Sequence, residues 1–127
     1  MKLRIKGNSL RFRVSRSELD RLVWTGAVED AVQFGPGREH RMVYALRRDD
    51  YAPALAVDYT PSRIMVRIPP AMINRWQNAD QVGIAGAIDF GNGEQLSILA
   101  EKDFACADGR LEDNLDTFAR PNAAASC

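Results

Sequence analysis

Five cationic side chains open the sequence at regular spacing. In "MKLRIKGNSLRFRV" they alternate with apolar residues, at Lys2, Arg4, Lys6, Arg11 and Arg13. Arginine offers a planar guanidinium fork that binds phosphate or carboxylate through two hydrogen bonds. This stripe of charge therefore predicts either an anion-binding surface or the solvated side of a sheet.

Two carboxylates near the other end of the chain are candidate internal partners. In "QLSILAEKDF", Glu101 and Asp103 fall on the opposite side of an alternating pattern from Leu96, Ile98 and Ala100. Their phase predicts either a lattice of ion pairs with the cations or a polar cavity. The candidate ligand-binding residues are Lys2, Arg4, Lys6, Arg11, Arg13, Arg67, Glu101 and Asp103. Glu29, Gln33, Arg41, Arg47 and Asp58 have phases that could add to the same face.

Catalytic signatures are missing from the sequence. It has no nucleophile paired with a base, no cluster at metal-ligand spacing and no glycine-rich phosphate loop. Cys106 and Cys127 have no second Cys or His at zinc-ligand spacing, and reduced thiols are expected. The sequence therefore favours a binding module over an enzyme and predicts neither a metal nor a cofactor.

The elements that position these residues begin with a hairpin. Strict alternation predicts strands over 2–6 and 10–14, joined by Gly7-Asn8-Ser9. Ser15 and Glu18 then form a capping box that predicts a helix over 16–24. Gly26 is expected to end that helix. Strands over 28–34 and 40–47 flank Gly35-Pro36-Gly37.

The same order of elements returns in the second half. Strands are predicted over 55–59, 63–68, 81–90 and 95–104, with a helix opened by Pro69-Pro70. Phe12-Arg13-Val14 matches Val66-Arg67-Ile68, and Val28 matches Val82, at an offset of 54. Phe34-Gly35-Pro36-Gly37 matches Phe90-Gly91-Asn92-Gly93 after two extra residues. These matches predict a duplication, with repeats over about 2–47 and 55–104.

The predicted fold class is α+β and mainly antiparallel β. Eight strands and two short helices favour a small barrel or a strongly bent sheet, because curling removes exposed edges. A single domain is expected over 1–104. Residues 105–127 are expected to form an irregular or partly disordered tail.

Composition limits the partners. The 127 residues carry seventeen cations and seventeen anions, with no secretory signal and no apolar run long enough to span a membrane. A cytoplasmic protein is predicted, with an anionic small molecule or a protein as its partner and no membrane contact. Cations gather in residues 1–16 and acids in residues 101–117, and this uneven distribution argues against a surface coated for nonspecific nucleic-acid binding. Nucleic acid is therefore the less favoured partner, and composition leaves the oligomeric state open.

Two motifs resemble known families. The opening residues together with "ILAEKDFAC" resemble a family of short bacterial hypothetical proteins, a domain of unknown function whose label implies no activity. Residues 63–101 are similar to the AbrB and MazE swapped-hairpin domains, through Ile68-Pro69, Asp80-Gln81-Val82 and Gly91-Asn92-Gly93. That second resemblance implies a dimer that contacts DNA with basic residues. The sequence departs from the pattern at Ala79-Asp80 and at Val14-Ser15.

A further alternative is a phosphate enzyme of the triphosphate-tunnel type. That class also has eight strands, internal symmetry and charges that line a lumen. It resembles this chain less at the N-terminus, where alternating glutamates would hold metal and this sequence has Lys2, Arg4 and Lys6.

Overall fold

The structure, a computed structural model, describes residues 1–105 and 115–119. The chain opens with the predicted hairpin, formed by β1 (Lys2–Lys6) and β2 (Ser9–Val14). Gly7 and Asn8 make the turn, and Gly7 adopts a φ of 54°, which glycine accepts without strain.

Helix α1 (Arg16–Thr25) follows as its capping box predicts. The Ser15 side chain accepts a hydrogen bond from the Glu18 amide, and the Glu18 carboxylate accepts one from the Ser15 amide. Gly26 ends the helix in the left-handed conformation. Strand β3 (Ala27–Gln33), a short 3₁₀ turn (Arg38–His40) and β4 (Arg41–Arg48) complete the first half.

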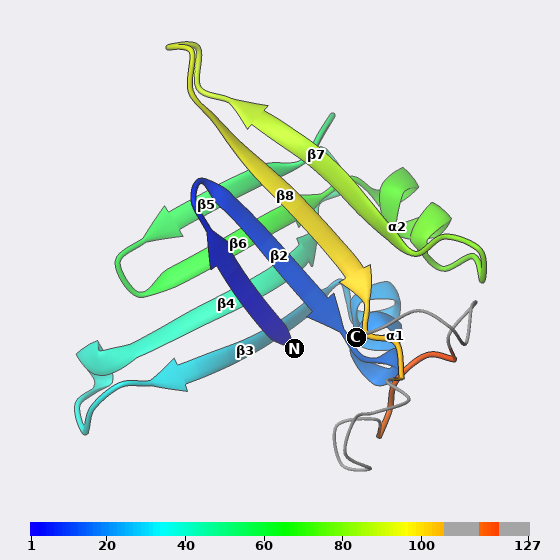
Figure 1. Ribbon diagram of the computed structural model, residues 1–127, viewed down its shortest axis with the longest axis horizontal. Helices are drawn as coiled ribbons and strands as arrows, with labels where there is room; N and C mark the ends of the chain where they lie inside the picture. Colours follow the sequence, from blue (N-terminus) through cyan, green and yellow to red (C-terminus); the bar gives the residue numbers. More distant parts are fainter. Residues whose placement is uncertain (106–114, 120–127) are drawn as a thin grey trace.

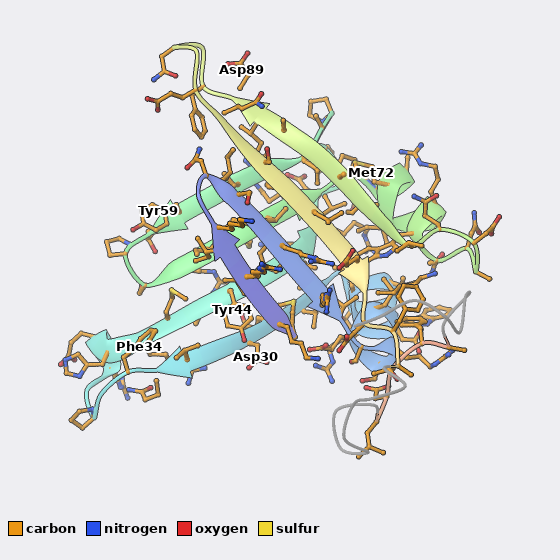
Figure 2. All side chains as sticks on the ribbon, in the orientation of Figure 1. Asp30, Phe34, Tyr44, Tyr59, Met72 and Asp89 are labelled. Atoms are coloured by element: carbon orange, nitrogen blue, oxygen red, sulfur yellow. The ribbon has the colours of Figure 1, made fainter. Side chains whose placement is uncertain are left out.

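The second half has the same order of elements. It consists of β5 (Ala56–Thr60), β6 (Arg63–Ile68), α2 (Pro70–Trp76), β7 (Gly83–Asp89) and β8 (Gln95–Lys102). Pro70 stands in the first turn of α2, where a missing amide costs nothing. Figure 2 shows that both β3–β4 and β7–β8 are long hairpins, with Phe34 and Asp89 near their tips.

The eight strands form two sheets of four, whereas the sequence predicted a small barrel or one strongly bent sheet. The first sheet has the order β1-β2-β8-β7 and the second has the order β3-β4-β6-β5. Each helix carries the chain from one sheet to the other, so the strands before and after it are not neighbours (Figure 1). The sheets are mixed, because β2 pairs with β8 and β4 pairs with β6 in parallel, whereas the hairpins are antiparallel.

The two halves are equivalent in register as well as in order. Ser9 lies opposite Ser97 in the pairing of β2 with β8. A shift of 54 residues between the halves turns this pair into Arg63 and Val43, which lie opposite each other in the pairing of β6 with β4. In β3 and β7 the shift is 56, since Ala27 pairs with Arg47 and Gly83 pairs with Glu101. Val28 therefore corresponds to Ile84, and the predicted match of Val28 to Val82 is wrong because the two extra residues lie before β7.

The core lies between the sheets, with the two helices on the same side of the molecule in Figure 1. Its buried residues in the first half are Leu10, Phe12, Val14, Leu19, Leu22, Val28, Tyr44 and Leu46. Those in the second half are Ile64, Val66, Ile68, Ile73, Trp76, Ile84, Ile98 and Ala100. Each residue of the first set corresponds to one of the second at the shifts given above. Apolar side chains thus fill the space that a tunnel would occupy.

Candidate anion-binding face

The predicted cations lie on the outer side of the first sheet. Leu10, Phe12 and Val14 point into the core, so Arg11 and Arg13, which alternate with them, point outward. Lys2 lies opposite Arg13, and Arg4 lies opposite Arg11, on the same side. We call this surface the basic face; it comprises Lys2, Arg4, Lys6, Arg11, Arg13 and Glu101.

Glu101 is shared by two arginines of the basic face. The parallel register of β2 with β8 places Arg13 beside Glu101. Oε1 of Glu101 accepts hydrogen bonds from Nε of Arg11 at 2.6 Å and from Nε of Arg13 at 3.0 Å. The Glu101 side chain is only 14% exposed, whereas the two arginines remain about one-third exposed. One carboxylate therefore fixes both guanidinium groups while leaving part of each accessible.

Asp103 holds Lys2 at the end of the same face. Its Oδ2 lies 2.9 Å from Nζ of Lys2, and its amide donates a hydrogen bond of 2.8 Å to the carbonyl of Val14. Both predicted carboxylates thus contact predicted cations. The structure brings together seven of the eight candidate residues.

The acids do not balance the cations on this face. Five cations face two carboxylates, and in the described part of the chain no carboxylate lies within ion-pair distance of Arg4 or Lys6. Like charges directly opposite one another, as in Arg4 and Arg11, repel. A hollow of about 180 Å³ lies among these residues, lined by Lys2, Leu3, Arg4, Arg11 and Arg13. A phosphate or carboxylate group placed there would relieve the repulsion.

Arg67, the eighth candidate, lies in β6 of the second sheet. Its guanidinium donates to Asp49 at 2.8 Å and to Asp58 at 2.9 Å. The hydrogen bond from Arg67 lowers the pKa of Asp49, and those two carboxylates raise the pKa of Arg67. The positions predicted to add to the basic face, Glu29, Gln33, Arg41, Arg47 and Asp58, also belong to the second sheet. Phase along a strand fixes the side of a sheet, but not which sheet the strand joins.

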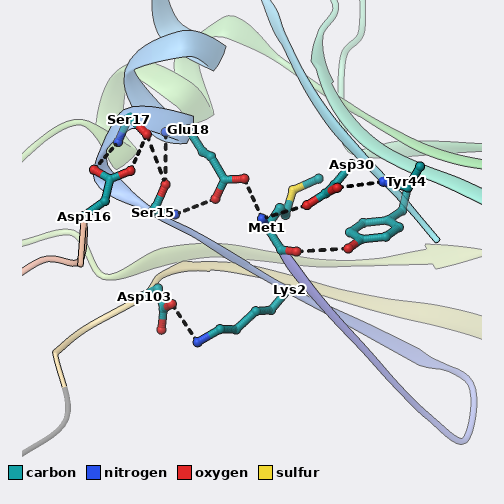
Figure 3. A network of polar contacts seen from close by, with 10 residues as sticks. Met1, Lys2, Ser15, Ser17, Glu18, Asp30, Tyr44, Asp103 and Asp116 are labelled. Carbon is teal, nitrogen blue, oxygen red and sulfur yellow. Dashed lines mark hydrogen bonds and ion pairs between the residues drawn. The ribbon is translucent and has the colours of Figure 1, made fainter. Parts of the chain in front are cut away.

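The α-ammonium group of Met1 has a site of its own that sequence patterns did not reveal. It lies 2.5 Å from Oε2 of Glu18 and 3.2 Å from Oδ2 of Asp30, and the Tyr44 hydroxyl donates to the Met1 carbonyl at 3.0 Å (Figure 3). Burial by itself lowers the pKa of this ammonium group, but the two carboxylates outweigh burial and raise it above its usual 8.0. The three partners come from different elements, so only tertiary structure brings them together.

Lys102 is the one buried charged side chain among the described residues. Burial lowers its pKa. Its Nζ donates to the carbonyl of Asn78 at 2.8 Å, just beyond α2, and lies 5.3 Å from the centre of the Phe118 ring. The equivalent residue Arg48 donates to the carbonyl of Val23 in α1 at 2.9 Å. Both cations satisfy carbonyl groups at or just beyond a helix C-terminus, which is a structural role.

Residues 115–119 pack beside the start of α1. The Asp116 side chain accepts hydrogen bonds from the Ser17 amide and hydroxyl (Figure 3). The Asp116 carbonyl accepts a hydrogen bond of 2.8 Å from the Arg16 amide. The Ser17 hydroxyl lowers the pKa of Asp116. The two cysteines, at 106 and 127, lie outside the described residues.

No described residues gather three or more His, Cys, Asp or Glu side chains in a way that could hold a metal ion. Within residues 1–105 and 115–119, neither helix is long and apolar enough to cross a membrane.

Comparison with known protein families gives a match that covers most of the chain. Residues 1–122 fit the model of a protein family described as a "Family of unknown function (DUF7009)". No curated protein and no solved structure matches the chain.

Proposed function

The chain belongs to the family of unknown function DUF7009, and we propose that it is a binding module whose basic face holds the phosphate or carboxylate groups of an anionic partner. Arg4 and Arg11, directly opposite each other beside the hollow, form the centre of the site. Lys2, Lys6 and Arg13 surround them.

A comparison of the two halves carries this proposal. At the positions equivalent to Lys2, Arg4 and Lys6 of β1, strand β5 has Ala56, Asp58 and Thr60. Both strands are edge strands with the same register to their neighbours. The fold therefore does not need cations at these positions, and their presence in β1 alone supports a role in binding.

Apart from Lys2, which pairs with Asp103, the cations of the face divide into two groups. Glu101 holds Arg11 and Arg13 in place, so these two guanidinium groups lose little conformational freedom when an anion binds. Arg4 and Lys6 are exposed and, within the described residues, have no acidic partner. They supply the positive charge that is not neutralised inside the molecule.

The proposal is tested with the double variant Arg4→Thr, Lys6→Thr. Titration calorimetry with sodium tripolyphosphate at low ionic strength should show binding to the native protein and affinity at least about tenfold weaker in the variant. The matched control is Arg41→Thr, Arg47→Thr in β4, which removes the same charge from the second sheet and should bind like the native protein. Affinity should fall as salt is added, because the site is exposed.

Two results would overturn the proposal. Tripolyphosphate and citrate could both fail to bind native protein at low salt, or the β1 and β4 variants could lose affinity equally. Equal losses would mean that net charge, and not the basic face, controls binding.

We further propose that the fold arose by duplication of a ββαββ unit. Support comes from the recurring element order, the matching registers and the pairing of the eight buried core residues of one half with eight of the other. In this view the basic face of the first sheet is a specialisation that the second sheet lacks.

A further inference from the structure

We infer that the partner at the basic face is an extended acidic polypeptide segment that pairs with β1 as a fifth strand of the first sheet. This inference rests on the proposed function and names the chemistry of its partner. Such a segment would bring both main-chain hydrogen bonds and alternating carboxylates to the same edge.

The first support is the edge itself. Strand β1 ends the first sheet, and a two-residue turn joins it to β2. Hydrogen-bonded and non-hydrogen-bonded pairs alternate away from such a turn, so the amide and carbonyl groups of Leu3 and Ile5 point away from β2. The Met1 carbonyl has the same phase, and it accepts its hydrogen bond from Tyr44, outside the first sheet. Among the described residues, the main chain of Leu3 and Ile5 makes no hydrogen bond to an element outside the hairpin, so these two positions can pair with an added strand.

The spacing of charge is the second support. Lys2, Arg4 and Lys6 alternate along β1, so consecutive cations lie two residues, or roughly 6.6 to 6.8 Å, apart. A neighbouring strand with acidic residues at every second position repeats the same distance on the same side of the sheet. Each carboxylate would then lie beside one cation of β1, in the manner of favourable cross-strand pairs.

Other occupants fit the edge less well. A second copy pairing through its own β1 would set cations against cations, which is unfavourable. Single-stranded nucleic acid is normally held by aromatic side chains that stack on bases, and the described residues of the basic face include none. Ile5, on the other side of the strand, is 60% exposed, and an added strand would cover it.

The equivalent edge at β5 provides an internal control. It has the same register to β6 as β1 has to β2, and its exposed residue Tyr59 corresponds to Ile5. It carries Asp58 where β1 carries Arg4. An acidic strand should therefore add to β1 and not to β5.

The experiment uses the full chain and the acetylated, amidated peptide Thr-Glu-Val-Glu-Thr-Glu-Val. A second peptide has the same sequence with N-methyl groups on its Thr and Val residues. When the Glu residues lie beside the cations in an antiparallel pair, the Thr and Val amides face Leu3 and Ile5, so methylation keeps the charges and removes these main-chain donors. Calorimetry should show the methylated peptide bound about tenfold more weakly, the loss expected from one to two hydrogen bonds. Hydrogen exchange followed by NMR should show the amides of Leu3 and Ile5 becoming protected by the parent peptide, with the β5 amides unchanged.

The outcomes separate this inference from the proposed function. If tripolyphosphate binding depends on Arg4 and Lys6 but the two peptides bind equally, or if Leu3 and Ile5 gain no protection, the added strand is wrong and the anion site stands. If Arg4→Thr, Lys6→Thr changes neither tripolyphosphate nor peptide binding, both fail. Protection of β5 in place of β1, or a peptide-induced dimer through β1, would also overturn the inference.

Discussion

Glu101 is the residue at which stability and the proposed anion binding would oppose each other. It neutralises part of the charge of Arg11 and Arg13 and holds these two side chains in place, so under the proposed function it would weaken the attraction of the basic face for anions. The equivalent position in the other half is Arg47, which shows that this carboxylate is specific to the first sheet.

Replacing Glu101 with Gln should therefore have two opposite effects. The free energy of unfolding should fall by about 1 kcal/mol, because charged hydrogen bonds to two partly exposed arginines are weakened. Affinity for tripolyphosphate should rise. Urea denaturation and calorimetry measure the two quantities. Glu29→Gln, which affects the looser 3.4 Å pair with Arg63, should change neither by much.

The Met1 ammonium group predicts a pH dependence. Its pKa is raised in the folded protein, so its stabilisation is fully present below the unfolded value of 8.0 and is lost as pH rises through the folded pKa. As pH rises from about 7.5 to 9.5, the contribution of this group to the urea denaturation midpoint should therefore decrease. Asp30→Asn should make that contribution smaller.

The native protein must be compared with Asp30→Asn, because Lys102 changes the free energy of unfolding with pH in the opposite direction. Its lowered pKa makes its own contribution to stability rise with pH. Identical slopes for native protein and Asp30→Asn over this window would contradict the assigned role of the ammonium site.

At the scale of elements, local sequence determined most boundaries. The capping box at Ser15, the stop at Gly26 and the strand over 63–68 all lie where the residues predicted them. These features depend on neighbours within a few positions, so the sequence contains all the information they need. The two helices start differently, since α1 has a side-chain cap and α2 relies on Pro70.

Removing the cap of α1 gives an element-scale prediction. Ser15→Ala should lower the free energy of unfolding by about 1 kcal/mol, because the Glu18 amide loses its acceptor. Thermal and urea unfolding measure it. Ser62→Ala, in the exposed turn before β6, serves as the control and should change stability much less.

At the scale of the whole molecule, the halves are interleaved. Among the described strands, one half meets the other inside each sheet through a single pairing, β2 with β8 in the first sheet and β4 with β6 in the second. Each half therefore contributes one hairpin to each sheet. Neither half holds a complete sheet by itself.

This interleaving predicts that residues 1–53 alone will not fold as a monomer. Without β6 and β8, strands β2 and β4 lack partners and the core residues of one half are exposed. Circular dichroism and sedimentation should show an unfolded chain or a homodimer in which two copies replace the two halves. A stable folded monomer would contradict the interleaved arrangement.

The sequence by itself determined the strands, the helices, the repeated order and the separation of cations from core residues along β1 and β2. These follow from periodicity and capping, which act over a few residues. Only the tertiary structure decided that the strands form two sheets instead of a barrel, that Arg67 belongs to the second sheet, and that Met1 meets Glu18 and Asp30. It also settled that the basic face points to solvent, because the apolar sides of both sheets and the helices bury one another. Pairing between distant strands depends on how well whole surfaces fit, and no short stretch of sequence records that fit.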